Sequence, residues 1–283
     1  MEGTFGILGM GRLGRALATA LAGSGTQVVC WNRSPAVAPV GVVLLRSTAE
    51  LAEAAETLLL TVSDDALPAV AAALAAERRD WSEQVVVHAS GRLGAGVLEP
   101  LAARGATVAA VHPVMTFAGN AAADAARLPG IGWAVTAADG EAERRGRALA
   151  ERLGGRPFAV REEDRALYHA ALAHAINHLA VVAVQGVELL RLAGAGDAAA
   201  VLRPAVEAAL ANALALGPAA ATGPLVRGDA GTVSAHVGAL QAAAPEMLPA
   251  YAALARAGIA AAVEGGRLTE EQAGRLRVVL ERP

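Results

Sequence analysis

Short apolar runs alternate with helix-like stretches over roughly the first 160 residues of the chain. The apolar runs predict strands at residues 5–8, 28–31, 42–45, 57–62, 84–88, 107–111, 133–136 and 158–160. Apolar residues at helical spacing predict helices between them, at residues 12–22, 48–55, 65–78, 95–103 and 140–153. This alternation is typical of a parallel sheet with crossover helices, so we predict an α/β, doubly wound Rossmann domain over residues 1–160.

The pattern changes from about Glu162 onwards, where strand-like runs disappear and alanine-rich helical patterns take over. Helices are predicted at residues 164–192, 197–216, 229–242, 248–257 and 269–280. The last of these opens with Thr269 followed three positions later by Gln272, the pattern of a capping box. Residues 161–283 are therefore predicted to form an all-α C-terminal domain, which supplies substrate contacts and the interface of a homodimer.

A glycine-rich turn follows the first predicted strand and precedes the first predicted helix. It reads Gly9-x-Gly11-x-x-Gly14. Gly9 suits a tight turn, Gly11 lets the backbone approach a pyrophosphate, and Gly14 allows the helix to pack closely on the sheet. The start of the helix would direct its N–H groups at the phosphates. We predict a dinucleotide site formed by Gly9, Met10, Gly11, Arg12, Leu13 and Gly14; the alternative is a purely structural turn.

The end of the second predicted strand indicates which dinucleotide binds. A cofactor with a free ribose 2′-hydroxyl is usually held there by Asp or Glu, and the chain has Asn32, Arg33 and Ser34 instead. Arg33 and Ser34 suit a 2′-phosphate, so we predict NADP rather than NAD. The missing acid also counts against S-adenosylmethionine. The alternative is that Arg33 is a solvated loop residue.

Composition excludes several classes of partner and chemistry. The net charge of -3 over 283 residues gives no electrostatic reason to expect nucleic acid or an anionic membrane. All 24 basic residues are arginine, so catalysis by a lysine Schiff base or a lysine acid is excluded. Cys30 is the only cysteine. Polar residues interrupt the apolar stretch at 170–190, and no signal peptide precedes the first strand, so we expect a cytoplasmic protein without a membrane span.

Polar groups follow three successive predicted strands: Ser63-Asp64-Asp65, His88-Ala89-Ser90-Gly91 and His112-Pro113. Ligands bind beyond the carboxyl ends of the strands in an open parallel sheet. We therefore predict Val62, Ser63 and His88 as cofactor contacts, and Ser90 and His112 as catalytic residues. The structural interpretations are Asp65 as a helix N-cap, Ser90 as a turn residue and His88 as a core histidine bonded to backbone.

A polar face also interrupts the first long helix of the second domain. Tyr168 and His169 are adjacent, and His174, Asn177 and His178 share a face at helical spacing. A buried polar face needs partners or a ligand. We predict His174 and Asn177 as catalytic and His169 as substrate-binding; the alternative is a solvent-filled groove or a dimer seam. No carboxylate lies one turn from His169 or His178 in a ligand-like pattern, so no metal site is predicted.

A polar loop separates two later apolar helices. The segment from Thr222 to Asp229 is dense in polar and conformationally special residues, and Asn212 precedes it. Arg227 is a fixed cation suited to a substrate carboxylate or to a cofactor phosphate. We predict Asn212, Thr222 and Arg227 as substrate-binding residues and Asp229 as a helix cap.

Together these motifs match one family in order: Gly9-x-Gly11-x-x-Gly14, Asn32-Arg33-Ser34, His88-x-Ser90-Gly91, His112-Pro113, Tyr168-His169, Asn177 and Thr222-Gly-Pro-x-x-Arg227-Gly-Asp229. In them the chain resembles bacterial Rossmann-like proteins whose C-terminal half is called domain of unknown function 2520. The resemblance covers nearly the whole chain. It implies an NADP-dependent oxidoreductase related in plan to pyrroline-carboxylate, 6-phosphogluconate and ketopantoate reductases.

One position departs from the broader plan. The β-hydroxyacid dehydrogenase and ketopantoate reductase plan has a lysine four residues before an asparagine on this helix. Asn177 matches the asparagine, but Ala173 stands at the lysine position. His112 or His174 is then the expected proton donor, because the unperturbed pKa of histidine lies near working pH.

The leading hypothesis is an NADPH-dependent reductase of a small carbonyl substrate, a 2-oxo acid such as ketopantoate. Asn177 would orient the carbonyl and Arg227 would hold a carboxylate. The alternatives are an imine reductase and a non-catalytic, NADP-sensing dimer. Methyl transfer is the least favoured, because Arg33 stands where an acid is expected.

Overall fold

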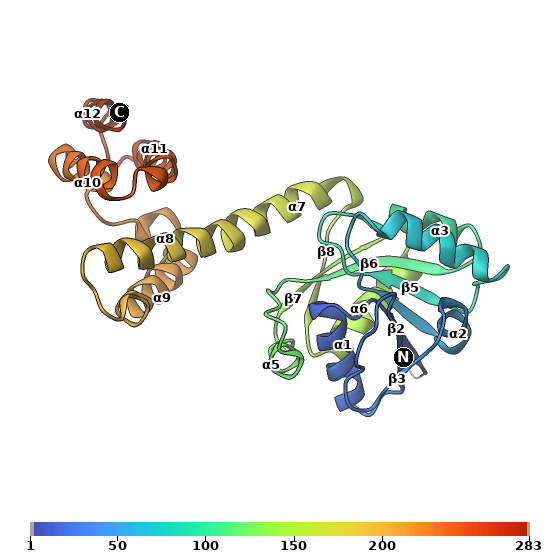
Figure 1. The fold of residues 1–283 in the computed structure, drawn as a ribbon. Helices are drawn as coiled ribbons and strands as arrows, with labels where there is room; N and C mark the ends of the chain where they lie inside the picture. Colours follow the sequence, from blue (N-terminus) through green and yellow to red (C-terminus); the bar gives the residue numbers. More distant parts are fainter. Residues whose placement is uncertain (1–2, 282–283) are drawn as a thin grey trace. The chain divides into compact units, whose positions relative to one another are not determined.

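The computed structural model describes residues 3–281, and the chain divides into two compact units between His174 and Ala175 (Figure 1). The first unit is built on one eight-stranded sheet. Its strands are β1 (Phe5–Leu8), β2 (Val28–Trp31), β3 (Val42–Leu44), β4 (Thr57–Leu60), β5 (Val85–His88), β6 (Thr107–Pro113), β7 (Gly132–Ala137) and β8 (Arg156–Ala159). The central strands β1, β4 and β5 are buried along their whole length, as expected for a sheet covered on both faces.

The strand order is β3-β2-β1-β4-β5-β6-β7-β8. The strands from β3 to β6 are parallel, and the order reverses between β1 and β4. The doubly wound prediction is therefore confirmed. A ligand is expected at this reversal, beyond the carboxyl ends of β1 and β4.

The sheet departs from the parallel arrangement at one edge, where β7 runs antiparallel to β6 and β8 is parallel to β7. The connection from β6 to β7 holds one short helix, α5 (Ala121–Ala126), which packs on α1 (Arg12–Gly23). With no helix crossing back over the sheet at this point, β7 starts beside the end of β6 and must run in the opposite direction.

Helices cover both faces of the sheet. On one face Leu17 and Leu21 of α1 and Leu149 of α6 (Gly140–Arg152) belong to the same buried cluster. On the other face lie α2 (Thr48–Ala54), α3 (Leu67–Glu77), the 3₁₀-helix η1 (Ala95–Leu98) and α4 (Glu99–Ala102). The N-cap of α3 is Ala66, so the prediction of Asp65 as that cap is wrong.

The sheet ends near the predicted domain boundary at residue 160, but the first compact unit continues to His174. Two polar side chains tie the following segment to the loop after β5. Arg165 donates from Nε to the Leu93 carbonyl oxygen at 3.0 Å and from Nη2 to the Ser90 carbonyl oxygen at 2.9 Å. The Glu162 carboxylate accepts the Ala95 N–H at 2.8 Å. These bonds explain why η2 (Glu162–Asp164) and α7 (Arg165–Leu172) belong to the first unit.

The long helix predicted at residues 164–192 contains a change of helical type. Its parts are α7, a π-helical segment η3 (Ala173–His178) and α8 (Leu179–Leu192). The wider π-helical turn changes the angular spacing of its residues, and the common face predicted for His174, Asn177 and His178 from α-helical spacing stays a prediction. The boundary between the two units falls inside this segment.

The second unit is all-helical, as predicted. It continues with α9 (Ala198–Leu216), η4 (Gly217–Ala220), η5 (Leu225–Arg227), α10 (Ala230–Ala243), η6 (Pro245–Met247), α11 (Leu248–Glu264) and α12 (Glu270–Leu280). Val233, Ile259 and Leu276 centre the core of α10, α11 and α12. Asp229 caps α10, and Thr269 and Gln272 form the predicted capping box of α12.

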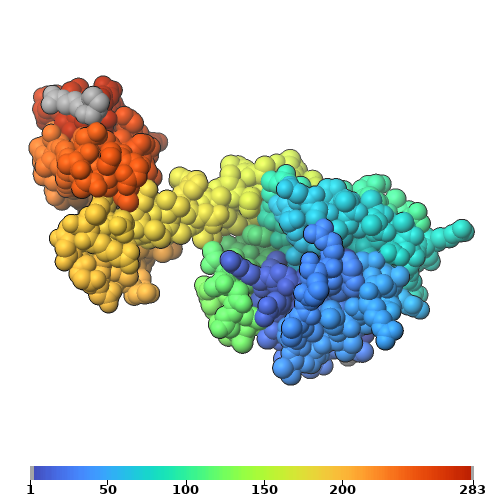
Figure 2. All heavy atoms as spheres, viewed as in Figure 1, coloured from blue at the N-terminus to red at the C-terminus, as the bar shows by residue number. Residues whose placement is uncertain are grey.

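Apolar side chains remain exposed on α8 and α9, in the yellow to orange part of Figure 2. Val184 is 70% exposed and Leu214 is 81% exposed. By length and composition alone, the helical stretches Glu162–Leu192 and Ala198–Arg227 are apolar enough to cross a membrane. Contact with another protein surface would cover the exposed apolar side chains of α8 and α9 as well as a membrane would.

Candidate functional site

The glycine turn between β1 and α1 has the geometry predicted for it. Gly9 has a φ of +103°, which favours glycine, and its N–H donates to the Trp31 carbonyl oxygen at 2.9 Å. The Thr61 hydroxyl donates to the Gly9 carbonyl oxygen at 2.6 Å. A Cβ at Gly14 would collide with that same carbonyl oxygen, whereas a Cβ at Gly11 would meet nothing within 4 Å. The turn is thus tightly packed at Gly9 and Gly14 and open at Gly11.

Gly11, the open position of the turn, directly precedes helix α1. Gly11 is the N-cap residue, makes no side-chain capping bond, and is followed by a first turn without an acidic residue. The N–H groups of such a turn and the helix dipole together favour an anion. Met10 contributes differently, because its N–H donates to Asn32 Oδ1 at 2.8 Å and its side chain is buried.

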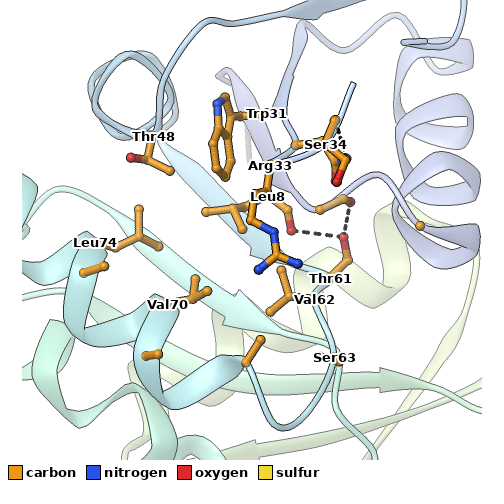
Figure 3. A pocket seen from close by; sticks show the side chains of 16 residues that line it. Leu8, Trp31, Arg33, Ser34, Thr48, Thr61, Val62, Ser63, Val70 and Leu74 are labelled. Atoms are coloured by element: carbon orange, nitrogen blue, oxygen red, sulfur yellow. Dashed lines mark hydrogen bonds between the residues drawn. The ribbon is translucent and has the colours of Figure 1, made fainter. Parts of the chain in front are cut away.

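A cavity of about 790 Å³ opens beside the turn (Figure 3). It lies at the carboxyl ends of β1, β2 and β4, where the strand order reverses. Seven of the predicted cofactor residues line it: Gly9, Gly11, Asn32, Arg33, Ser34, Val62 and Ser63. Met10, Arg12, Leu13 and Gly14 do not line it and instead form the turn and the start of α1 behind it.

Arg33 gives the cavity its charge. Figure 3 shows the Arg33 side chain pointing into the cavity toward Val62 and Val70. Among the described lining residues none is acidic, and Ser34 stands next to Arg33. An open glycine N-cap, an anion-favouring helix start and an arginine fit a dinucleotide that carries an additional 2′-phosphate. The residues present therefore fit NADP better than NAD.

Sequence reasoning missed the other walls of this cavity. These residues are Leu8, Trp31, Thr48, Thr61, Ala66, Ala69, Val70, Ala73 and Leu74. The last five belong to α3 and the residue before it, which were interpreted only as a crossover helix. Because α3 is apolar on nearly every side, its pattern does not distinguish the core face from the cavity face. Trp31 could have been predicted from the sequence, since it ends β2 and directly precedes the predicted ribose-binding residues.

His88 does not behave as a cofactor contact. Its side chain is 1% exposed, and both ring nitrogens are bonded to backbone. Nδ1 accepts the Ser90 N–H at 3.1 Å, so Nε2 carries the hydrogen that is donated to the Gly94 carbonyl oxygen at 2.8 Å. Burial lowers the pKa of His88 to about 4. The structure supports the core interpretation and corrects the cofactor assignment.

Ser90 also has a structural role in this loop. Its Oγ accepts the backbone N–H groups of Arg92 at 3.2 Å and Leu93 at 3.0 Å. It is 7% exposed. Its hydroxyl hydrogen is still available as a donor, so the prediction of Ser90 as a catalytic residue stays open beside its role in the turn.

A cluster of aromatic polar side chains lies at the carboxyl ends of β5 and β6. His112 Nδ1 is 2.7 Å from the Tyr168 hydroxyl oxygen. The rings of His112 and His169 are perpendicular, with centroids 6.5 Å apart. A Cβ at Gly91 would come within 3.0 Å of His112 Nε2 and 2.7 Å of His169 Cδ2, so both imidazoles pack over the bare Gly91 backbone. The structure therefore unites His112 and His169 with Tyr168, which had been noted only as a motif residue.

Burial controls the charge of this cluster. Burial is the largest cause, and together with the neighbouring Arg165 and His169 it lowers the pKa of His112 to about 4. Burial also raises the pKa of Tyr168 to about 12, against the effect of Arg165. At neutral pH His112 is an uncharged imidazole and Tyr168 an intact phenol.

Arg165 packs against the hydrogen-bonded pair of His112 and Tyr168. It is 1% exposed, and its guanidinium carbon lies 5.6 Å from the centroid of the Tyr168 ring. Two backbone carbonyls hold Nε and Nη2, while Nη1 is buried without a hydrogen-bond partner. A buried, fixed cation thus faces the phenol.

The remaining predicted residues lie later in the chain than this cluster. His174 belongs to the π-helical segment and is exposed. Asn177, Asn212, Thr222 and Arg227 belong to the second unit and are exposed as well. Their roles in catalysis and substrate binding stay predictions.

The fold and the cavity define a doubly wound protein of the Rossmann type. Residues 3–113 match the Rossmann-like domain, and residues 131–258 match the domain of unknown function 2520. The chain is thus a Rossmann-like domain followed by that C-terminal domain, as the resemblance indicated. The second match begins before β7, so it includes the last part of the sheet. No curated protein sequence matches this chain.

Solved structures share the fold. A candidate NADP oxidoreductase from Bacteroides fragilis is 22% identical with a TM-score of 0.76, over 91% of this chain and 98% of that one. A reductive aminase from Aspergillus terreus, in complex with NADPH and ethyl levulinate, is 19% identical with a TM-score of 0.71, over 98% and 99%. A pyrroline carboxylate reductase from Plasmodium falciparum, with NADP bound, is 12% identical with a TM-score of 0.61, over 99% and 98%.

Proposed function

We propose that this protein is an NADPH-dependent reductase of a small molecule with a C=O or C=N bond. The observation that carries the proposal is the pairing of two features at one edge of the parallel strands. An anion-favouring cavity with Arg33 lies at the ends of β1, β2 and β4, and a hydrogen-bonding cluster lies at the ends of β5 and β6. Reduction needs both, since one binds the cofactor and the other polarises the bond.

The chain's own residues would hold the cofactor as follows. The N–H groups at the start of α1 bind the pyrophosphate, and Gly11 lets it approach the backbone. Arg33 and Ser34 bind the 2′-phosphate. The bound NADPH supplies a hydride. The cluster around His112 and Tyr168 polarises the double bond and moves the proton.

The substrate class is supported from two sides. Arg227 suits a substrate carboxylate, which favours a 2-oxo acid, with ketopantoate as the first candidate. An imine reductase and a reductive aminase from Aspergillus terreus share the fold, as does the pyrroline carboxylate reductase, and the names of the first two point to imine substrates and amine products. A cyclic imine carrying a carboxylate would satisfy both considerations, so it belongs in the same panel of substrates.

We further propose that the active form is a cytoplasmic homodimer joined through α8 and α9. Both helices expose large apolar side chains, including Val184 and Leu214. The polar residues His178, Gln185 and Glu188 on the same helical stretch favour a protein partner over a lipid bilayer. Closed homodimers are the commonest soluble oligomers.

A thermal-shift titration with NADPH, NADH and S-adenosylmethionine tests the cofactor assignment. A ligand at 100 times its dissociation constant stabilises its site by about 2.7 kcal/mol, which moves the midpoint by a few degrees. A larger shift with NADPH than with NADH supports the role of Arg33. Absence of a shift with either nucleotide contradicts the proposal.

Turnover is then measured as NADPH oxidation with ketopantoate, other 2-oxo acids and 1-pyrroline-carboxylate. Oxidation of NADPH by one of these substrates supports the reductase. NADPH binding without oxidation of any of them would instead support the alternative, a non-catalytic NADP-binding dimer.

A further inference from the structure

Among the described side chains beyond the ends of β5 and β6, Tyr168 combines a dissociable proton, a bonded partner and a neighbouring fixed charge. Its hydroxyl oxygen lies 2.7 Å from His112 Nδ1, and its ring is flanked by the Phe158 ring with centroids 6.1 Å apart. The Arg165 guanidinium stands over the ring. These contacts fix both the position and the orientation of the phenol.

We propose that Tyr168 donates the proton to the reduced double bond, and that His112 is a positioning residue that acts as its uncharged partner. The inference rests on the proposed function, because it assigns one step of that reduction. It replaces the expectation that a histidine is the acid.

The step balances as follows. The carbon of the double bond takes up a hydride, and the π-electron pair moves to the oxygen or nitrogen. That atom forms a bond to the Tyr168 hydroxyl hydrogen, and the O–H bond breaks with its electron pair left on the phenolate oxygen. The phenolate accepts a hydrogen bond from His112 Nδ1–H, and water later returns the proton. The substrate is reduced, and Tyr168 ends each cycle unchanged.

His112 is the weaker candidate for the acid. A proton on its imidazole would lie in a buried site that also faces the positive charge of Arg165. With a pKa of about 4, His112 is protonated in about one molecule in a thousand at pH 7. A neutral imidazole with hydrogen on Nδ1, by contrast, is well suited to stabilise a phenolate.

Arg165 favours the same assignment. Its charge is held in place by the carbonyl oxygens of Ser90 and Leu93 and cannot turn away from the ring. A fixed cation beside a forming phenolate stabilises the negative charge without reorganisation at the moment of proton transfer. Arg165 lowers the pKa of Tyr168 in the free protein, although burial outweighs it.

The pH dependence of wild-type turnover distinguishes the two acids without any substitution. A histidine acid with a pKa of about 4 predicts kcat falling about tenfold per pH unit between pH 5 and pH 8. A tyrosine acid predicts a nearly constant kcat over this range. The charged and titratable groups that face the pair are His169, Arg165, His88 and Asp64.

Substitution gives the second test. Tyr168→Phe removes only the hydroxyl and should lower kcat about 100-fold or more, with KM and the NADPH dissociation constant changed less than about threefold. Tyr251→Phe is the matched control, because Tyr251 is the only other tyrosine and lies in the second unit. His169→Gln should lower kcat less than about tenfold.

The possible outcomes distinguish a failure of the Tyr168 assignment from a failure of the proposed reductase function. Turnover that persists in Tyr168→Phe, a larger loss in His169→Gln, or a kcat that falls steadily from pH 5 to pH 8 would overturn the inference alone. Failure of the wild-type protein to bind or oxidise NADPH would overturn the proposed function together with it. If Tyr168→Phe does not fold, the wild-type pH profile decides between the two acids.

Discussion

The Tyr168 hydroxyl oxygen lies 2.7 Å from His112 Nδ1, although the two residues are 56 positions apart in the chain. His112 is the last residue but one of β6, and Tyr168 lies on α7, the first α-helix after the sheet. The bond therefore joins the sheet to the helix that leads out of the first unit. It places a dissociable proton at the same edge of the sheet as the NADP-fitting cavity.

Two glycines of helix α1 should respond oppositely to alanine. Gly14→Ala places a methyl group against the Gly9 carbonyl oxygen and Thr61 Oγ1, so the turn must shift, and we expect a loss of about 2 kcal/mol or more in the free energy of unfolding. Gly23→Ala meets nothing within 4 Å and should be neutral or gain up to about 1 kcal/mol from helix propensity.

All three tryptophans, Trp31, Trp81 and Trp133, lie in the first unit, so denaturation followed by their fluorescence measures this unit. Equal stability of the two glycine variants would contradict the packing described at Gly14.

Arg33 should determine the choice between the two nicotinamide cofactors. Arg33→Gln removes a charge-assisted contact to the 2′-phosphate, and we expect NADPH to bind about 10–100-fold more weakly. NADH lacks that phosphate and should change less than about threefold. Isothermal titration with both nucleotides measures the difference. Arg79→Gln, an exposed arginine outside the cavity, is the control, and an equal loss for both nucleotides in Arg33→Gln would refute the assignment.

His88 should make the first unit lose stability in mild acid. Its folded-state pKa of about 4 lies below the unfolded value near 6.5, so its contribution is complete above pH 6.5. Between pH 6.5 and pH 4 the unfolded state takes up the proton first, and on the order of 3 kcal/mol is lost across this window.

Urea denaturation of the wild type and of His88→Gln at several pH values, followed by tryptophan fluorescence, measures this loss. The wild-type curve should fall more steeply than that of the variant. His236→Gln, at an exposed histidine of the second unit, should leave the wild-type slope unchanged. Parallel curves for wild type and His88→Gln would show that His88 does not titrate as described.

The exposed face of α8 and α9 should be where the homodimer forms. Leu214→Arg places a charge on a side chain that is 81% exposed in the single chain, and we expect it to shift the protein from dimer to monomer. Light scattering coupled to size exclusion gives the mass directly. Val278→Arg on α12 is the control and should remain dimeric. A monomeric wild type would rule out this part of the proposal.

The sequence predicted the sheet well because its central strands are buried on both faces and appear as unbroken apolar runs. The glycine turn was equally visible, since Gly9 and Gly14 have few substitutes in that geometry. The reversal at β7 was not visible, because strand direction depends on where the connecting helix packs. Helix α5 was missed altogether; it is short and alanine-rich.

The site was predicted less completely for physical reasons that differ from residue to residue. His112 and His169 were found from their positions, but their pairing with Tyr168 depends on how α7 packs after the sheet. His88 was assigned to the cofactor because a strand-end histidine looks the same in sequence whether its nitrogens face a ligand or backbone. The π-helical segment at His174 and Asn177 leaves no mark in apolar spacing.

The hydroxyl of Thr61, the residue that follows β4, donates a hydrogen bond to the Gly9 carbonyl oxygen at 2.6 Å. The turn is therefore held in shape by a side chain that directly follows β4. A loop that is already ordered loses little conformational entropy when a ligand arrives, so more of the contact energy with the phosphates remains as affinity. Thr61, which also lines the cavity, can thus influence how tightly the cofactor is held through the shape of the turn.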